Sequence, residues 1–219
     1  MNTRKLRMAA LVLAAGLSGA AQAALEGRDL NGSIDSFEAY YDTDLDITWL
    51  ADANMNGTMN WVAANAWAAT LSFTDGVNVY GNWRLPTTLQ PDATCESQPG
   101  GIFYNCTGSE MGHLFYSELG GTAGQSILTS ADPDLAKFTN LQAYSYWSAT
   151  EYGPGVAGDF SFYGGGQSGA GKNGGFYTLA VSPGDIGIAA IPEPETYAMM
   201  LAGLLFIGFA KRHNSKNHS

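Results

Sequence analysis

Basic residues are scarce over most of this 219-residue chain. Between residues 24 and 190 only Arg28, Arg84, Lys137 and Lys172 oppose 18 acidic residues, which gives this stretch a formal charge of −14. Nucleic-acid binding depends on lysine and arginine contacts to phosphates, so this composition excludes nucleic acid as a partner. An acidic surface also repels anionic lipids and polyanions, and it suits cations or neutral partners.

Cysteine and histidine are equally rare between residues 24 and 190. Cys95 and Cys106 are the only cysteines, and in an exported protein such a close pair is expected to form a disulfide. The alternative, a metal or thiol site, lacks nearby histidine or cysteine partners. His113 is the single histidine, and next to Leu114 and Phe115 we expect it to be packed and hydrogen-bonded.

Motifs of nucleophilic or zinc-dependent hydrolysis are missing too. The chain contains no Ser-x-x-Lys, Gly-x-Ser-x-Gly or His-Glu-x-x-His sequence. We therefore expect no enzyme. A glycosidase with paired carboxylates is the catalytic alternative that stays open, because acidic residues are abundant and their separation is not visible in a sequence.

Long apolar runs occur only at the two ends of the chain. At the N-terminus a basic front (Arg4, Lys5, Arg7) precedes an apolar stretch over residues 8–17 and an Ala-Gln-Ala ending at Ala23. These are the three parts of a secretory signal peptide, 1–23, with cleavage expected after Ala23. The apolar stretch is about half of the ~20 residues that a transmembrane helix needs, so we do not expect it to anchor the protein.

The C-terminal segment, 191–219, combines three features. Pro192-Glu193-Pro194 is followed by an uncharged stretch over residues 197–210 and then by Lys211-Arg212. This order resembles the PEP-CTERM sorting signal. As a helix the stretch is ~21 Å long, short for a ~30 Å hydrocarbon core, and its basic flank predicts that the C-terminus stays inside.

The resemblance to PEP-CTERM signals implies a route for the protein. An exosortase-type enzyme would cut near Pro192-Glu193-Pro194 after transient anchoring in the inner membrane. The protein would then reach the cell surface or an extracellular matrix rich in exopolysaccharide.

Residues 24–190 are long enough to form one domain with a single core. Alternation and helical spacing predict two helices and several short strands without βαβ repeats, which favours an α+β fold. Strands are expected within 34–49, where residues 42–44 form a turn, and a further strand is expected at 144–150. A hairpin is expected to join 159–163 to 176–181. The expected helices are 60–71 and one that starts after Thr107, in a capping box with Glu110, and stops at 120–121. In the extended piece 83–86 we expect Trp83 and Leu85 to be buried and Arg84 to satisfy carbonyls or an acidic side chain.

Residues 38–187 resemble the Lcl-type C-terminal domain family. The resemblance is carried by short motifs at 45–54, 66–67, 82–87, 113–116, 140–142, 146–150 and 183–185. It implies a compact C-type lectin-like domain with two helices and short twisted antiparallel strands. Members are exported surface modules, and some are adhesins that hold sulfated polysaccharide on basic surfaces. Because this chain is strongly acidic, we expect a neutral glycan or another envelope component instead.

Asp52-x-Asn54-x-Asn56-Gly matches the first half of a calcium loop, and Thr58 falls at the next ligand position. The bidentate glutamate of such loops is missing, because Ala63 stands at the twelfth position. Hydrogen bonds within an Asx turn explain the same pattern without metal. We expect no obligatory cofactor, with calcium as the possible one.

Three tyrosines near glycine-rich turns, Tyr152, Tyr163 and Tyr177, are candidate ligand contacts, because exposed aromatic rings stack on sugars. The alternative is a hairpin that buries these rings on one side. The leading hypothesis is an exported binding module of the cell surface or matrix. The alternatives are a structural exopolysaccharide-matrix protein without a specific ligand and an extracellular carbohydrate-active enzyme.

Overall fold

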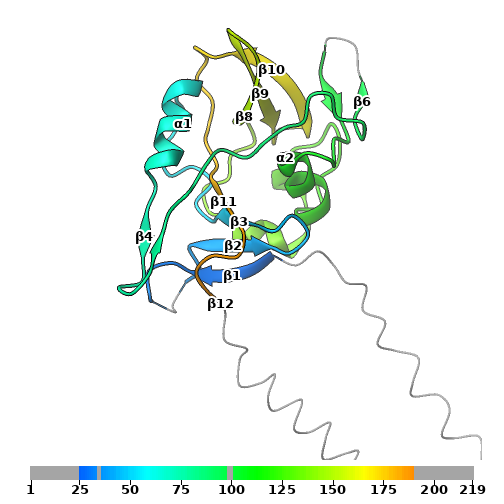
Figure 1. The fold of residues 1–219 in the computed structure, drawn as a ribbon. Helices are drawn as coiled ribbons and strands as arrows, with labels where there is room; N and C mark the ends of the chain where they lie inside the picture. The colour runs from blue at the N-terminus through cyan, green and yellow to red at the C-terminus, as the bar shows by residue number, and fades with distance from the viewer. Residues whose placement is uncertain (1–24, 34–35, 98–100, 190–219) are drawn as a thin grey trace, which may run out of the picture.

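The computed structural model describes residues 25–33, 36–97 and 101–189. In this part of the chain antiparallel strands dominate. Two five-stranded sheets lie at opposite ends of the domain, with α1 on one side and α2 on the other (Figure 1). A two-stranded hairpin of β4 (Phe73–Thr74) and β5 (Val79–Tyr80) extends beside the first sheet.

The first sheet has the strand order β11-β3-β2-β1-β12. Its strands are β1 (Leu25–Asp29), β2 (Ala39–Asp42), β3 (Ile47–Leu50), β11 (Val181–Pro183) and β12 (Ile188–Ala189). The predicted strand–turn–strand of 34–49 is confirmed by β2 and β3, which pair Asp42 with Ile47. Because β1 pairs with β12, the first and last described strands lie side by side.

The second sheet has the strand order β6-β7-β10-β9-β8. Its strands are β6 (Glu96–Ser97), β7 (Phe103–Tyr104), β8 (Ser145–Gly153), β9 (Val156–Ser161) and β10 (Gly166–Gly171). The predicted hairpin between 159–163 and 176–181 is wrong, because β9 pairs with β8 and with the glycine-rich β10. A Cβ at Gly169 would lie 3.0 Å from the ring of Tyr152, so the glycine leaves room for this ring to pack closely on β10.

The helices are short. The predicted first helix is confirmed as α1 (Trp61–Thr70), whose N-cap Asn60 accepts a hydrogen bond from the amide of Ala63. The second helix begins later than predicted. Its N-cap is Ser109 rather than Thr107, and α2 (Glu110–His113) runs directly into a π-helix, Leu114–Glu118. Two 3₁₀ turns follow, Ile127–Thr129 and Pro133–Lys137.

The expected α+β, C-type lectin-like fold with two helices is wrong. The described chain is mostly β, and its two α-helices have ten and four residues. The apolar spacing after residue 107 is helical, but the α-helix changes to a π-helix after His113, and Gly120, at a φ of +60°, follows the end of that π-helix.

The main core lies between the two sheets and the helical turn of α2. Trp49, Phe115, Tyr146, Phe160 and Phe162 are fully buried there. The rings of the three phenylalanines and Tyr146 meet edge to face or tilted, with the centroids of Tyr146 and Phe162 5.0 Å apart. Burial of one such side chain stabilises the fold by about 1.5–3 kcal/mol, so these aromatics hold the sheets together.

Each of the four basic side chains in the described chain is paired with a carboxylate. The pairs are Arg28 with Asp185 (2.5 Å) and Glu26 (2.8 Å), Arg84 with both oxygens of Glu110 (2.6 and 2.8 Å), Lys137 with Asp134 (2.8 Å), and Lys172 with Glu151. The prediction for residues 83–86 is therefore confirmed, since Trp83 and Leu85 are buried and Arg84 binds an acidic side chain.

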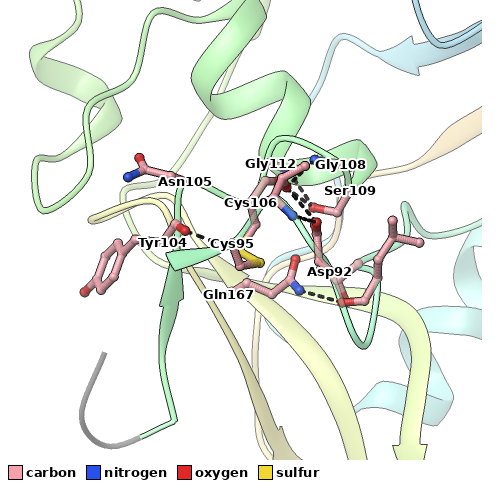
Figure 2. Close-up of a disulfide and its surroundings, with 12 residues drawn as sticks. Asp92, Cys95, Tyr104, Asn105, Cys106, Gly108, Ser109, Gly112 and Gln167 are labelled. Carbon is pink, nitrogen blue, oxygen red and sulfur yellow. Dashed lines mark hydrogen bonds between the residues drawn. A yellow bond between two sulfur atoms is a disulfide. The ribbon is translucent and has the colours of Figure 1, made fainter. Parts of the chain in front are cut away.

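The disulfide between Cys95 and Cys106 is present, as predicted (Figure 2). It closes a loop next to the start of α2. The carbonyl of Cys106 accepts a hydrogen bond from Oγ of Ser109, and that Oγ accepts one from the amide of Gly112. A Cβ at Gly112 would lie 1.8 Å from the same carbonyl, so this close approach requires glycine. The disulfide thus secures the N-cap of α2.

Replacing both cysteines tests this role. We expect Cys95→Ser with Cys106→Ser to lower the free energy of unfolding by about 2–3 kcal/mol, because the closed loop restricts the unfolded chain. Urea unfolding of the variant and of the oxidised and reduced wild type measures this difference in the free energy of unfolding. Equal midpoints for all three would show that the disulfide does not stabilise the fold.

Candidate functional site

A pocket of about 470 Å³ opens where β2 begins and β3 ends. This volume lies within the range of about 300–1,000 Å³ that is common for small-ligand sites. Four separate segments contribute walls: 36–40, 50–55, Phe73 of β4, and 136–139. The lining residues are Ser36, Phe37, Glu38, Tyr40, Leu50, Ala51, Asp52, Met55, Phe73, Ala136, Lys137 and Thr139.

Backbone hydrogen bonds join three of these segments. The amide of Ala51 donates to the carbonyl of Glu38 at 2.8 Å, and the amide of Thr139 donates to the carbonyl of Ala51 at 2.9 Å. The amide of Ala53 donates in turn to the carbonyl of Thr139 at 3.0 Å. The walls are therefore fixed by main-chain contacts rather than by side chains alone.

Aromatic side chains supply much of the apolar wall. Phe37 and Tyr40 meet edge to face with their centroids 6.2 Å apart, and Phe73 packs against the buried Trp83 at 5.6 Å. Burial, together with the nearby carboxylates of Asp134 and Glu38, raises the pKa of Tyr40. The Tyr40 hydroxyl therefore stays protonated at neutral pH and is available as a donor.

Two charged side chains of the pocket wall, Glu38 and Lys137, are oriented by their own contacts. The carboxylate of Glu38 accepts hydrogen bonds from the amide of Leu30 at 3.0 Å and from Nδ2 of Asn31 at 2.6 Å. Nζ of Lys137 donates to the carbonyl of Leu25 at 2.8 Å and lies 5.8 Å from the centroid of Tyr40. Apolar rings beside a few oriented polar groups can bind a sugar, whose C–H face packs on rings while its hydroxyls form hydrogen bonds.

Of the four residues predicted as calcium ligands, Asp52, Asn54, Asn56 and Thr58, only Asp52 lines the pocket. Its Oδ1 accepts hydrogen bonds from the amide of Asn54 at 3.0 Å and from Nδ2 of Asn140 at 3.1 Å. This is the Asx turn that was the alternative to a metal loop. Calcium binding at this turn stays a prediction.

The three candidate tyrosines do not line the pocket, and β8 and β9 separate two of them. The register of these strands places Tyr152 near the Gly153–Val156 end and Tyr163 beyond Ser161 at the other end. The hydroxyl of Tyr152 lies 3.0 Å from Oγ1 of Thr88, whereas Tyr163 is 68% exposed.

Tyr177 is partly buried and packs against the main core. Its ring centroid lies 5.6 Å from that of Tyr146 and 6.0 Å from that of Tyr144. The pocket aromatics Phe37, Tyr40 and Phe73 were not identified from the sequence as ligand contacts. They come from segments that only the folded chain brings together, and no short motif marks them.

Comparison with protein families identifies the tail. Residues 190–214 match the family described as the PEP-CTERM protein-sorting motif. The chain therefore carries this motif, which indicates export and C-terminal membrane anchoring through the exosortase system. The motif itself, Pro192-Glu193-Pro194, and the uncharged stretch 197–210 lie outside the described residues, as do the signal peptide and Ala23. Among the described residues no helix is long and apolar enough to cross a membrane.

No curated protein and no solved structure matches the chain. The resemblance of residues 38–187 to the Lcl-type family accordingly has no support from these comparisons. The exported domain has to be interpreted from its own pocket and charges.

The turn at Asp52 gives a test of the calcium prediction. We expect Asp52→Ala to lower the free energy of unfolding by roughly 1 kcal/mol with or without calcium, because two donors lose their acceptor. Thermal melts in calcium and in chelator measure this loss of stability. Asp44→Ala, on the turn between β2 and β3, is the control. A calcium-dependent stabilisation of the wild type that Asp52→Ala abolishes would instead place the ion in this turn.

The sorting motif gives a second test. In a host that carries an exosortase, we expect the wild type to lose its tail and Glu193→Ala to accumulate uncut in the inner membrane. Glu195→Ala, just outside Pro-Glu-Pro, is the matched control. Immunoblots of membrane and extracellular fractions separate the forms, and identical processing with and without the exosortase would contradict the assignment.

Proposed function

We propose that this protein is a non-enzymatic binding module of the cell surface or extracellular matrix. The sorting tail delivers it, and the pocket beside β2 and β3 holds a neutral glycan of the envelope. No catalytic step is required for this function.

The observation that carries the proposal is the pocket itself. It combines the rings of Phe37, Tyr40 and Phe73 with two carboxylates that act as hydrogen-bond acceptors, Glu38 and Asp52. Sugars need both kinds of contact, because a pyranose ring has apolar C–H faces and a polar edge. A glycan unit could therefore be held without any charged group of its own.

The excess of negative charge on the domain supports a neutral rather than an anionic ligand. All four basic side chains of the described chain are already paired with carboxylates, and Lys137, the one in the pocket wall, also donates to the carbonyl of Leu25. A sulfated or uronic polysaccharide would meet excess negative charge without an available cation. Binding of the proposed glycan should accordingly depend little on salt.

A glycan array with the full chain, exported and purified in mild detergent, tests the proposal. We expect neutral oligosaccharides to bind, and Tyr40→Ala to weaken binding about two- to tenfold, since contact with one aromatic ring contributes roughly 0.5–1.5 kcal/mol. Met55→Trp is a second variant. Met55 is 42% exposed at the pocket, so a larger side chain there narrows the pocket without disturbing the core.

Tyr163→Ala is the matched control, because Tyr163 is an exposed aromatic outside the pocket. If Tyr163→Ala weakens binding and the pocket variants do not, the site is elsewhere. If no glycan binds in calcium or in chelator, the binding function is wrong and a structural matrix protein is the better account.

One observation favours a carbohydrate-active enzyme as the second candidate. Glu38 and Asp52 line the same pocket, and glycosidases act through a pair of carboxylates. Incubation with host exopolysaccharide, followed by analysis of released sugars, distinguishes the two. Turnover that both Glu38→Gln and Asp52→Asn abolish would establish the enzyme, whereas binding without released sugars supports the module.

A further inference from the structure

One histidine and two carboxylates form a buried cluster at the junction of β2 and α2. Nε2 of His113 lies 3.0 Å from Oε1 of Glu118 and 3.9 Å from Oδ2 of Asp42. The three ligating atoms all lie within 4.8 Å of one another. The side chains of Glu118 and Asp42 are 0% and 1% exposed, and that of His113 is 13% exposed. None of the three residues lines the pocket.

The π-helix places Glu118 in this cluster. His113 and Glu118 are five residues apart, and in an α-helix such residues point about 140° away from each other. The π-helix aligns them instead, and the amide of Leu119 donates to the carbonyl of Leu114 at 2.9 Å in the i→i+5 pattern. Such turns are frequent at functional sites.

The charges of the cluster do not balance. Two carboxylates face one imidazole, so a protonated ring would still leave one negative charge in a place almost closed to water. Buried charges are normally paired or bound to a metal ion. Oε2 of Glu118 is buried and has no hydrogen-bond partner among the described residues. This oxygen therefore lacks the partner that its burial requires.

Asp42 is held in a fixed orientation. Its Oδ1 accepts hydrogen bonds from the amides of Asp44 at 3.1 Å and Leu45 at 3.0 Å, and its Oδ2 accepts one from Nε1 of Trp49 at 3.1 Å. Outer hydrogen bonds of this kind orient the carboxylates that bind metal ions. Oδ2 of Asp42 retains a lone pair that can bind a cation in the cluster.

We propose that Asp42, His113 and Glu118 bind one divalent cation of the zinc class. Two ligands about 2.0–2.1 Å from a tetrahedral ion are about 3.3 Å apart, which the observed 3.0 and 3.9 Å bracket. A water molecule would take the fourth position, as in zinc sites with three protein ligands, and would donate a hydrogen bond to the buried Oε2 of Glu118. The ion neutralises both carboxylates and ties the end of β2 to the turn after α2, independently of any glycan.

Zinc titration of the full chain tests the site. The chain is exported, purified in mild detergent, stripped with chelator and titrated with Zn²⁺. His213→Gln and His218→Gln are introduced in every sample, so that the histidines of the tail offer no ligand for zinc. We expect one ion per chain by elemental analysis, a higher melting temperature, and with Co²⁺ a visible absorption band of tetrahedral coordination.

Glu118→Gln keeps the shape of the side chain and removes one ligand charge, so we expect it to weaken zinc binding by about 100-fold. Asp42→Asn is the second ligand variant. Asp159→Asn is the matched control, since Asp159 is 3% exposed and outside the cluster, and it should bind as the wild type does. A wild type that binds neither Zn²⁺ nor Co²⁺, or binding that both ligand variants leave unchanged, would overturn the proposal.

Discussion

The pairing of a few cations with an excess of carboxylates is the constraint on which the domain depends. Arg28 joins β1 to Asp185 near the end of the domain, and Arg84 joins the extended piece after β5 to Glu110 at the start of α2. Lys172 reaches from the end of β10 to Glu151 in β8. Because these three cations link segments that are far apart in sequence, and Lys137 pairs locally with Asp134, all four charges are matched by carboxylates within the fold.

This use of charge leaves two consequences. The described chain has no unpaired lysine or arginine, so the proposed binding of a neutral glycan relies on aromatic rings and hydrogen-bond acceptors, and residues of both kinds line the pocket beside β2 and β3. Inside the domain, Asp42 and Glu118 share only His113, and a bound cation is the simplest source of the missing positive charge. Both proposals therefore arise from the shortage of positively charged side chains. The glycan proposal concerns the surface pocket, and the cation proposal concerns the buried cluster.

Sequence patterns predicted what is local. The helical spacing of 60–71, the alternation in β2 and β3, and the close cysteine pair depend on neighbouring residues, and the structure confirms all three. The fold class and the pairing of β9 were missed because they depend on partners distant in sequence, and a glycine-rich strand such as β10 resembles a turn. The pocket was missed for the same reason. The cluster of His113 and Glu118 was missed because these two side chains point away from each other on an ideal α-helix. Only the tail, a linear motif, could be assigned from sequence in full.

NMR titration of the isotope-labelled protein with neutral host oligosaccharide, at low and high salt, tests the account most directly. The account predicts shifts confined to residues 36–40, 50–55 and 136–139 and to Phe73, with an affinity that salt hardly changes. Shifts centred on Tyr152, Tyr163 or Tyr177, or an affinity that salt abolishes, would contradict it.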